Sequence, residues 1–171
     1  MTLTETPQWV LLFSFWLHML ATVVWIGGLA SAALFVLPAA RKLLPVDDYA
    51  RFVTKFNQKL NPLGWLSAGV LVATGLVQMG ANPSYEGFLN FGNDWAQAML
   101  IKHLLFGGMI LVSGYLTWGL APALERLAIA QLRSPNPEEE MRLRQVESRL
   151  LYLNLLLGIL VLVLTAMARI A

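Results

Sequence analysis

The sequence predicts an all-α integral membrane protein in which four transmembrane helices form an up-down-up-down bundle. Hydrophobic residues make up 57% of the 171-residue chain and charged residues only 13%, which is far from the balance of soluble domains. The apolar residues come in four long blocks, each near or above the roughly 20 residues that cross a bilayer core. Because backbone groups in lipid must be hydrogen-bonded internally, each block is expected to be a helix. We interpret residues 1–171 as a single transmembrane domain.

The first two spans are predicted at residues 9–37 and 62–79. The first apolar block ends before Pro38, and Pro62 is a typical first residue of a helix. Between them, residues 47–60 carry one apolar and one basic stripe at helical spacing, which predicts an amphipathic helix at the cytoplasmic interface. A solvated cytoplasmic connector explains the same pattern equally well.

The third and fourth spans are predicted at residues 95–120 and 150–167. Pro122 closes the third block. Before the fourth, Asn136 can cap a helix whose first turn holds a proline and three glutamates. This helix is expected to begin with a cytoplasmic extension at residues 137–149, because the whole helix is too long for the bilayer.

The distribution of basic residues predicts the orientation of the spans. Five Lys or Arg residues lie between spans one and two and five between spans three and four, whereas the N-terminus and residues 81–94 hold none. Basic loops stay in the cytoplasm. We therefore expect a multi-pass protein of the inner (plasma) membrane with both termini on the periplasmic or extracellular side. The chain has no cysteine, which excludes thiolate metal sites, and nothing in it resembles a nucleic-acid-binding surface.

Three ionisable residues lie within the predicted spans, and such residues are functional candidates by default: His18, Lys102 and His103. His18 and His103 lie at nearly the same distance from the outer ends of their spans. In the predicted bundle, spans one and three are diagonal neighbours separated by roughly 13 Å. That separation suits two imidazoles with one metal between them, which predicts a bis-His haem b near the outer face.

The helix faces around the two histidines have room for a flat macrocycle. His18 shares its face with Trp25 and with small polar residues, and His103 shares its face with Met99 and Gly107. A hydroxyl or a backbone carbonyl one turn away can fix the tautomer of a ligating imidazole. Lys102, Arg169 or water can meet the haem propionates. The predicted cofactor site therefore comprises six residues: His18, His103, Lys102, Trp25, Met99 and Gly107.

Two other interpretations explain the same residues. The histidines can form hydrogen bonds between helices while the glycines allow close packing, and Asn154 on the fourth span is interpreted as such polar glue. Copper is the second alternative, because Met19, Met79 and Met99 should lie in the outer half, and thioethers with imidazoles suit cuprous ion. The predicted spans hold no carboxylate to orient a histidine, so no catalytic residue is predicted.

The run HMLATVVWIGGL at residues 18–29 resembles the first-helix signature of the copper-resistance protein D family, in which a His precedes a Trp-x-Gly-Gly motif. Four further matches to that superfamily follow: Arg51-Phe52, Asn61-Pro62, Thr74-Gly75-Leu76 and Lys102. The related HemJ-type protoporphyrinogen oxidases share several of these positions. Resemblance to them implies haem b or porphyrin binding, with His18 and Lys102 as the positions that carry over.

Four functional hypotheses follow from these observations. The first is a membrane b-type haem protein in electron transfer, more a redox or binding protein than a stand-alone enzyme. The second is a copper transport or resistance protein, and the third is a protoporphyrinogen oxidase that depends on Lys102 and His18. The fourth is a subunit of a respiratory complex without a cofactor. The expected partners are membrane lipid, a redox partner or respiratory-complex subunits, and a homo-oligomer is compatible with the sequence.

Overall fold

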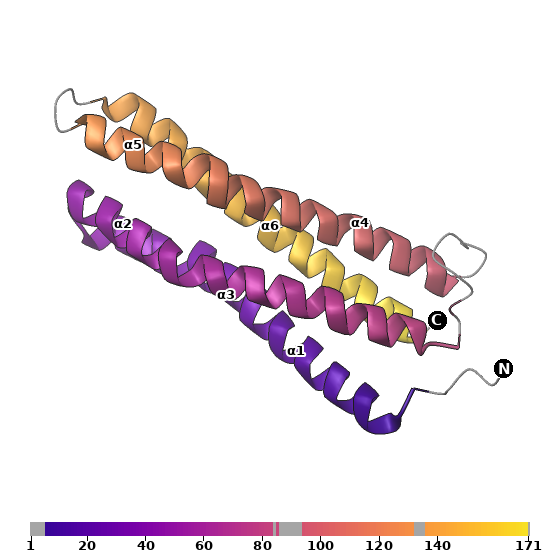
Figure 1. Cartoon of the computed structure of the whole chain (residues 1–171). Coiled ribbons are helices and arrows are strands. Elements are labelled where there is room, and N and C mark those ends of the chain that lie inside the picture. Colours follow the sequence, from indigo (N-terminus) through magenta and orange to yellow (C-terminus); the bar gives the residue numbers. More distant parts are fainter. Residues whose placement is uncertain (1–5, 84, 86–93, 132–135, 171) are drawn as a thin grey trace.

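The computed structural model describes residues 6–83, 85, 94–131 and 136–170, and these residues form helices without a strand. The elements run in this order: α1 (Gln8–Ala30), η1 (Ser31–Val36), α2 (Leu37–Leu43), α3 (Val46–Gly80), α4 (Asp94–Gly114), η2 (Tyr115–Leu120), α5 (Ala121–Gln131) and α6 (Pro137–Ile170). They build four rods that lie side by side in one elongated bundle (Figure 1). The predicted all-α fold is confirmed.

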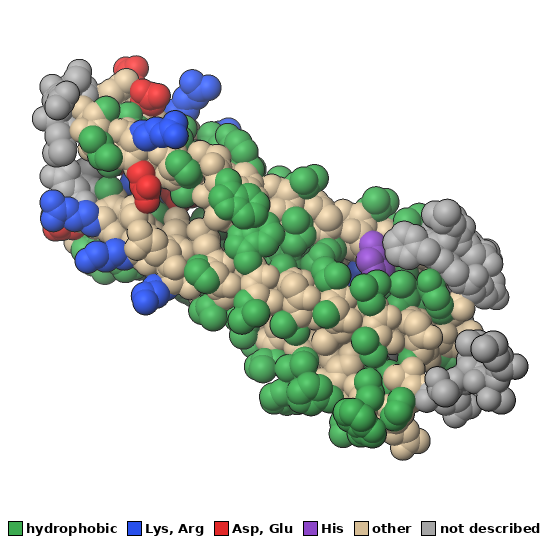
Figure 2. All heavy atoms as spheres, in the orientation of Figure 1, with side chains coloured by type: hydrophobic (Ala, Val, Ile, Leu, Met, Phe, Trp, Pro, Cys, Tyr) green, Lys and Arg blue, Asp and Glu red, His purple; other side chains and the backbone are tan. Residues whose placement is uncertain are grey.

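Each of the four rods is long and apolar enough to cross a membrane: Gln8–Leu43, Asp48–Gly80, Trp95–Gln131 and Pro137–Ala168. Large apolar side chains cover the outside of the rods, including Val23 at 68% exposure and Leu111 at 75%. Lys, Arg, Asp and Glu side chains gather instead at the end of the bundle where α2 and α5 lie (Figure 2). An apolar outer surface with charges at one end is what a multi-pass membrane protein requires. Which membrane side each end faces stays a prediction.

The helices do not end at the prolines as the sequence pattern predicts. α2 carries Pro38 in its first turn directly after η1, and Pro122 follows η2 in the same way. η1 and η2 are single-turn π-helices. A proline removes a backbone donor and pushes against the preceding turn, and a π-helical turn before each proline accommodates both effects. Pro62 lies inside α3 instead of at its start, so the predicted helix start there is wrong.

The predicted amphipathic segment 47–60 is the first part of α3 and not a separate helix. Tyr49 of its apolar stripe and the nearby Val53 are buried against Leu37 and Ala40 of α2. The stripe therefore packs partly inside the protein. The predicted extension at 137–149 is likewise continuous with the fourth span, and Asn136 caps it by accepting a hydrogen bond from the Glu139 backbone N–H at 3.2 Å.

The helices pack most extensively as two pairs, α1 with α3 and α4 with α6. A core formed by Trp25, Leu29, Ala68 and Met109 joins the pairs near the middle of the bundle. There the rings of Trp25 and Phe106 meet edge to face, with centroids 5.3 Å apart. Trp25 and Met109, which are 6% and 1% exposed, close the centre of the bundle to solvent.

Asn154 of α6 is fully buried, and its side-chain Nδ2 donates to Ser113 Oγ of α4 at 2.8 Å. The predicted interhelical role of Asn154 is confirmed. We expect Asn154→Ala to lower the free energy of unfolding by about 1 kcal/mol, the usual size of such a contact between transmembrane helices. Leu153→Ala, at an exposed neighbouring position, is the control. The measurement is reversible unfolding in mixed micelles.

A double-mutant cycle with Ser113→Ala tests the assignment of this energy to the hydrogen bond. The effects of the two substitutions should be less than additive, because either one removes the same contact. Strictly additive effects would show that Asn154 stabilises the helix pair in some other way.

Candidate functional site

His18 lies half-buried on α1 against α3 and is the centre of a polar cluster inside the bundle. Its Nδ1 lies 2.8 Å from Thr74 Oγ1. Ser14, one turn earlier on α1, donates from Oγ to the Thr74 carbonyl at 3.1 Å, and Gln78 Nε2 donates to the Ser14 carbonyl at 3.2 Å. The ring lies beside Gly75, where a Cβ would stand 3.7 Å from His18 Cε1, an ordinary van der Waals distance. The cluster fixes both the position and the plane of the imidazole.

The hydrogen bonds of Thr74 decide which nitrogen of His18 carries the proton. Thr74 Oγ1 lies 2.6 Å from the Val70 carbonyl oxygen. Two oxygens come that close only with a proton between them, and only the hydroxyl can supply it. Thr74 therefore donates to Val70 and accepts from His18 Nδ1–H. The neutral ring then carries its lone pair on Nε2, which is the arrangement found in metal-binding histidines.

His103 has the same tautomer for a different reason. Its Nδ1 lies 2.6 Å from the Met99 backbone carbonyl oxygen, which can only accept, so Nδ1–H donates and Nε2 carries the lone pair. The side chain of His103 is exposed on the surface of α4. For His103 the partner is a backbone carbonyl one turn away, as expected, whereas for His18 it is the hydroxyl of Thr74 on α3 and not a group on its own helix.

The neighbour of His18 on α4 is Lys102, which lies close enough for the two charges to interact. Lys102 is half-buried, whereas His103 is exposed, as expected when consecutive helical residues point about 100° apart. A metal shared by His18 and His103 stays a prediction. Of the other predicted site residues, Trp25 lies two turns deeper in the core, and a Cβ added at Gly107 would meet open space. Within the described ranges, no three His, Asp or Glu residues form a metal cluster.

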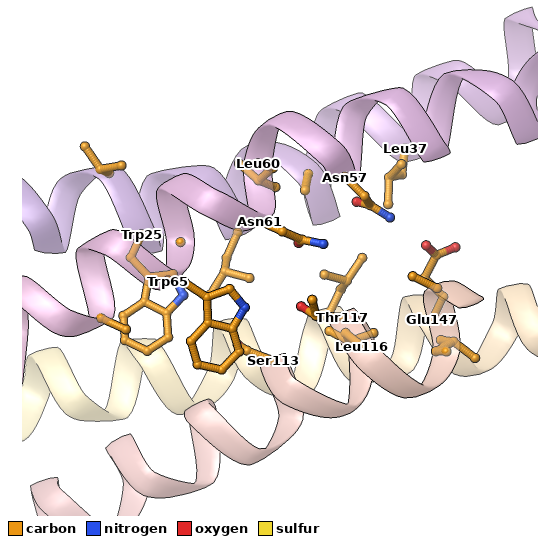
Figure 3. Close-up of a pocket in the computed structure, with 18 residues that line it drawn as sticks. Trp25, Leu37, Asn57, Leu60, Asn61, Trp65, Ser113, Leu116, Thr117 and Glu147 are labelled. Atoms are coloured by element: carbon orange, nitrogen blue, oxygen red, sulfur yellow. The ribbon is translucent and has the colours of Figure 1, made fainter. Parts of the chain in front are cut away.

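A second polar region, which the sequence analysis did not identify, lies nearer the charged end of the bundle (Figure 3). It is a partly open cavity of about 70 Å³ between α1, α3, η2 and α6. Seven of its lining residues have polar atoms on their side chains: Trp25, Asn57, Asn61, Trp65, Ser113, Thr117 and Glu147. Asn57 and Asn61 are four residues apart and share one helix face, which is a signal that the sequence offered.

Glu147 is the acidic residue of this cavity and is only 4% exposed. Its Oε2 lies 3.5 Å from Arg144 Nη1. Arg144 also lies over the ring of Tyr49, and Arg41 donates from Nε to the Tyr49 hydroxyl at 3.0 Å and from Nη2 to the Arg144 carbonyl at 3.0 Å. The buried carboxylate is therefore balanced by nearby arginines and not left as a bare charge.

The tautomer of His18 is directly measurable, because the chain has only two histidines. In ¹⁵N-histidine-labelled His103→Ala protein, we expect His18 to show a protonated Nδ1 and an unprotonated Nε2. Adding Thr74→Val removes the acceptor and should produce a mixture of tautomers. Thr165→Val is the matched control, since Thr165 also bonds an i−4 carbonyl but lies on an exposed face. A protonated Nε2 of His18 in the His103→Ala protein with Thr74 unchanged would contradict the hydrogen-bond assignment.

Comparison with known proteins finds the family that the first-helix motif resembles, but through a match to later residues of the chain. The family model described as Copper resistance protein D matches residues 50–168, which is more than half of the sequence. The match covers Thr74, Lys102 and the cavity residues of α3, η2 and α6, and begins after His18. Neither a curated protein nor a solved structure matches the chain. The chain belongs to the Copper resistance protein D family.

Proposed function

We propose that this protein binds copper at His18 and carries it through the membrane as part of copper resistance. The observation that carries the proposal is the His18 imidazole, held by Thr74 with its Nε2 lone pair available in the transmembrane bundle. Imidazole nitrogen is a good ligand for copper in both oxidation states. Membership of the Copper resistance protein D family supports copper as the metal.

The surroundings of His18 suit a mobile cargo better than a permanently bound metal. His18 is the one imidazole in the polar cluster with Ser14, Thr74 and Gln78. Met19 is 60% exposed on the outside of α1 and is therefore not beside the His18 ring. With few strong donors at the site, copper should bind and leave readily, as passage through a membrane requires.

Haem b is the second candidate, because the Nδ1–H tautomer found in both histidines also suits an axial haem ligand. The arrangement around His18 fits a haem poorly. The charge of Lys102 on α4 acts on the ring, and the lining of the 70 Å³ cavity includes neither histidine. We therefore place copper before haem, and the same purified sample tests both.

Copper binding is the first test of the proposal. Purified protein titrated with cuprous ion, under a competing chelator of known affinity, should bind about one equivalent. His18→Ala should weaken binding by at least about tenfold through loss of a direct ligand, whereas His103→Ala, on an exposed face, should change it little. Equal losses in both variants, together with a low-spin haem spectrum, would contradict the proposal and support the cytochrome interpretation.

Lys102 provides an independent test of whether a cation binds at His18. An ammonium group near His18 repels a bound cation, so Lys102→Gln should strengthen copper binding, by roughly three- to tenfold for a partly screened interaction. Exposed Lys55 gives the control variant Lys55→Gln, which should have no effect. Weaker copper binding in Lys102→Gln would mean that Lys102 supports the metal site and does not oppose it.

A further inference from the structure

We infer that the cavity lined by Asn57, Asn61, Ser113, Thr117 and Glu147 is a water-filled release chamber through which the cation leaves toward the charged end of the bundle. The inference rests on the proposed transport function and adds a second site to it. In Figure 3 the side chains of Asn57 and Asn61 from α3, Thr117 from η2 and Glu147 from α6 lie around one space, which Ser113 of α4 also lines. They come from three helices that are distant in sequence.

The cavity has the size and the polar groups to hold water, although most of its lining residues are apolar. A volume of about 70 Å³ exceeds the ~10–15 Å³ that one buried water needs, so several waters fit. Carboxamides, hydroxyls and a carboxylate supply the two to four polar partners that each water requires. Ser113 already accepts from Asn154 and Glu147 is paired with Arg144, but each oxygen keeps lone pairs with which a water can bond.

An apolar plug separates this chamber from His18. Trp25 lines the cavity and packs edge to face on Phe106, and Met109 completes the same core. His18 lies two turns from Trp25 on the other side of the plug. The bundle thus has a nitrogen-donor site and a hydrated oxygen-donor site with a closed apolar layer between them. This is the arrangement expected of a transporter in a closed state.

The chemistry of the chamber favours release over retention. Its donors are oxygens, which hold cuprous ion weakly compared with imidazole or thioether. The one carboxylate, Glu147, is already paired with Arg144 at 3.5 Å, so a cation must compete for it. A cation that crosses the plug would therefore meet water and a weak, charge-balanced site. Weak binding at an exit is a requirement for conduction.

Both π-helical turns border the chamber. Ala32 of η1 lines it from one side, and Leu116, Thr117 and Leu120 of η2 line it from another. π-helical turns inside long helices are frequent at functional sites. Here they lie at matching positions in the first and third spans, each ending two residues before a proline. Their placement gives the chamber wall two points at which the helices deviate from regular packing.

Cysteine accessibility tests the chamber, because the chain has no cysteine of its own. Thr117→Cys and Asn61→Cys should react with a small, membrane-impermeant thiol reagent added to the side facing α2 and α5. Reaction needs a hydrated thiolate, so Leu63→Cys, on an exposed face of α3, should be at least about tenfold slower in the bilayer. Reagent on the opposite side should label none of the three.

Trp25→Ala in the Thr117→Cys background should open the plug and make Thr117→Cys reactive from both sides. If Thr117→Cys and Asn61→Cys are labelled no faster than Leu63→Cys, the proposal of a hydrated chamber is wrong, regardless of the copper-binding result at His18. Copper binding that is independent of His18, with intact one-sided labelling, would instead overturn the proposed function and leave a hydrated chamber in place. Equal labelling of Thr117→Cys from both sides, with Trp25 unchanged, would show that Trp25 does not close the path.

Discussion

The contact between α1 and α3 is the interaction on which the candidate site depends. Lipid supplies little hydrophobic drive for helix association, so transmembrane helices pair through close packing and interhelical hydrogen bonds. Here Ser14 and His18 of α1 bond to Thr74 of α3, and Gln78 bonds back to Ser14. The same contacts that hold the helices together also fix the imidazole.

Glycine allows this close approach. A Cβ on Gly28 of α1 would stand 3.1 Å from Leu60 Cδ1 of α3, which is closer than an ordinary contact. Small residues at such positions let helix backbones come together in membranes. The proposed copper site at His18 and the stability of the bundle therefore depend on the same interface. The second interface, between α4 and α6, has its own polar contact at Asn154 and lines the opposite wall of the chamber.

The sequence predicts the four spans and their approximate places because apolar length is a strong signal in membrane proteins. It also predicts the cap at Asn136 and the buried contact at Asn154. It does not predict the helix ends, since a π-helical turn before Pro38 and Pro122 lets each helix continue. The tendency of proline to end a helix is a local effect, and the π-helical turn before each proline allows the helix to continue.

The site was predicted only in part, for geometric reasons. His18 faces the bundle as expected, but whether Lys102 or His103 faces it depends on a rotation of about 100° in a helix that is apolar on all sides. The hydropathy pattern therefore does not show how this helix is rotated about its axis. The chamber was missed because its polar groups are single residues on three different helices, and Glu147 was assigned to an extension outside the bilayer. Only packing brings these residues together.

The central claim is that His18 binds copper through Nε2. X-ray absorption at the copper K-edge of the copper-loaded protein tests it most directly, because imidazole gives a characteristic scattering pattern from the far side of its ring. The account predicts an imidazole contribution that persists in His103→Ala and disappears in His18→Ala. A first shell without imidazole, or one that is the same in both variants, would contradict it.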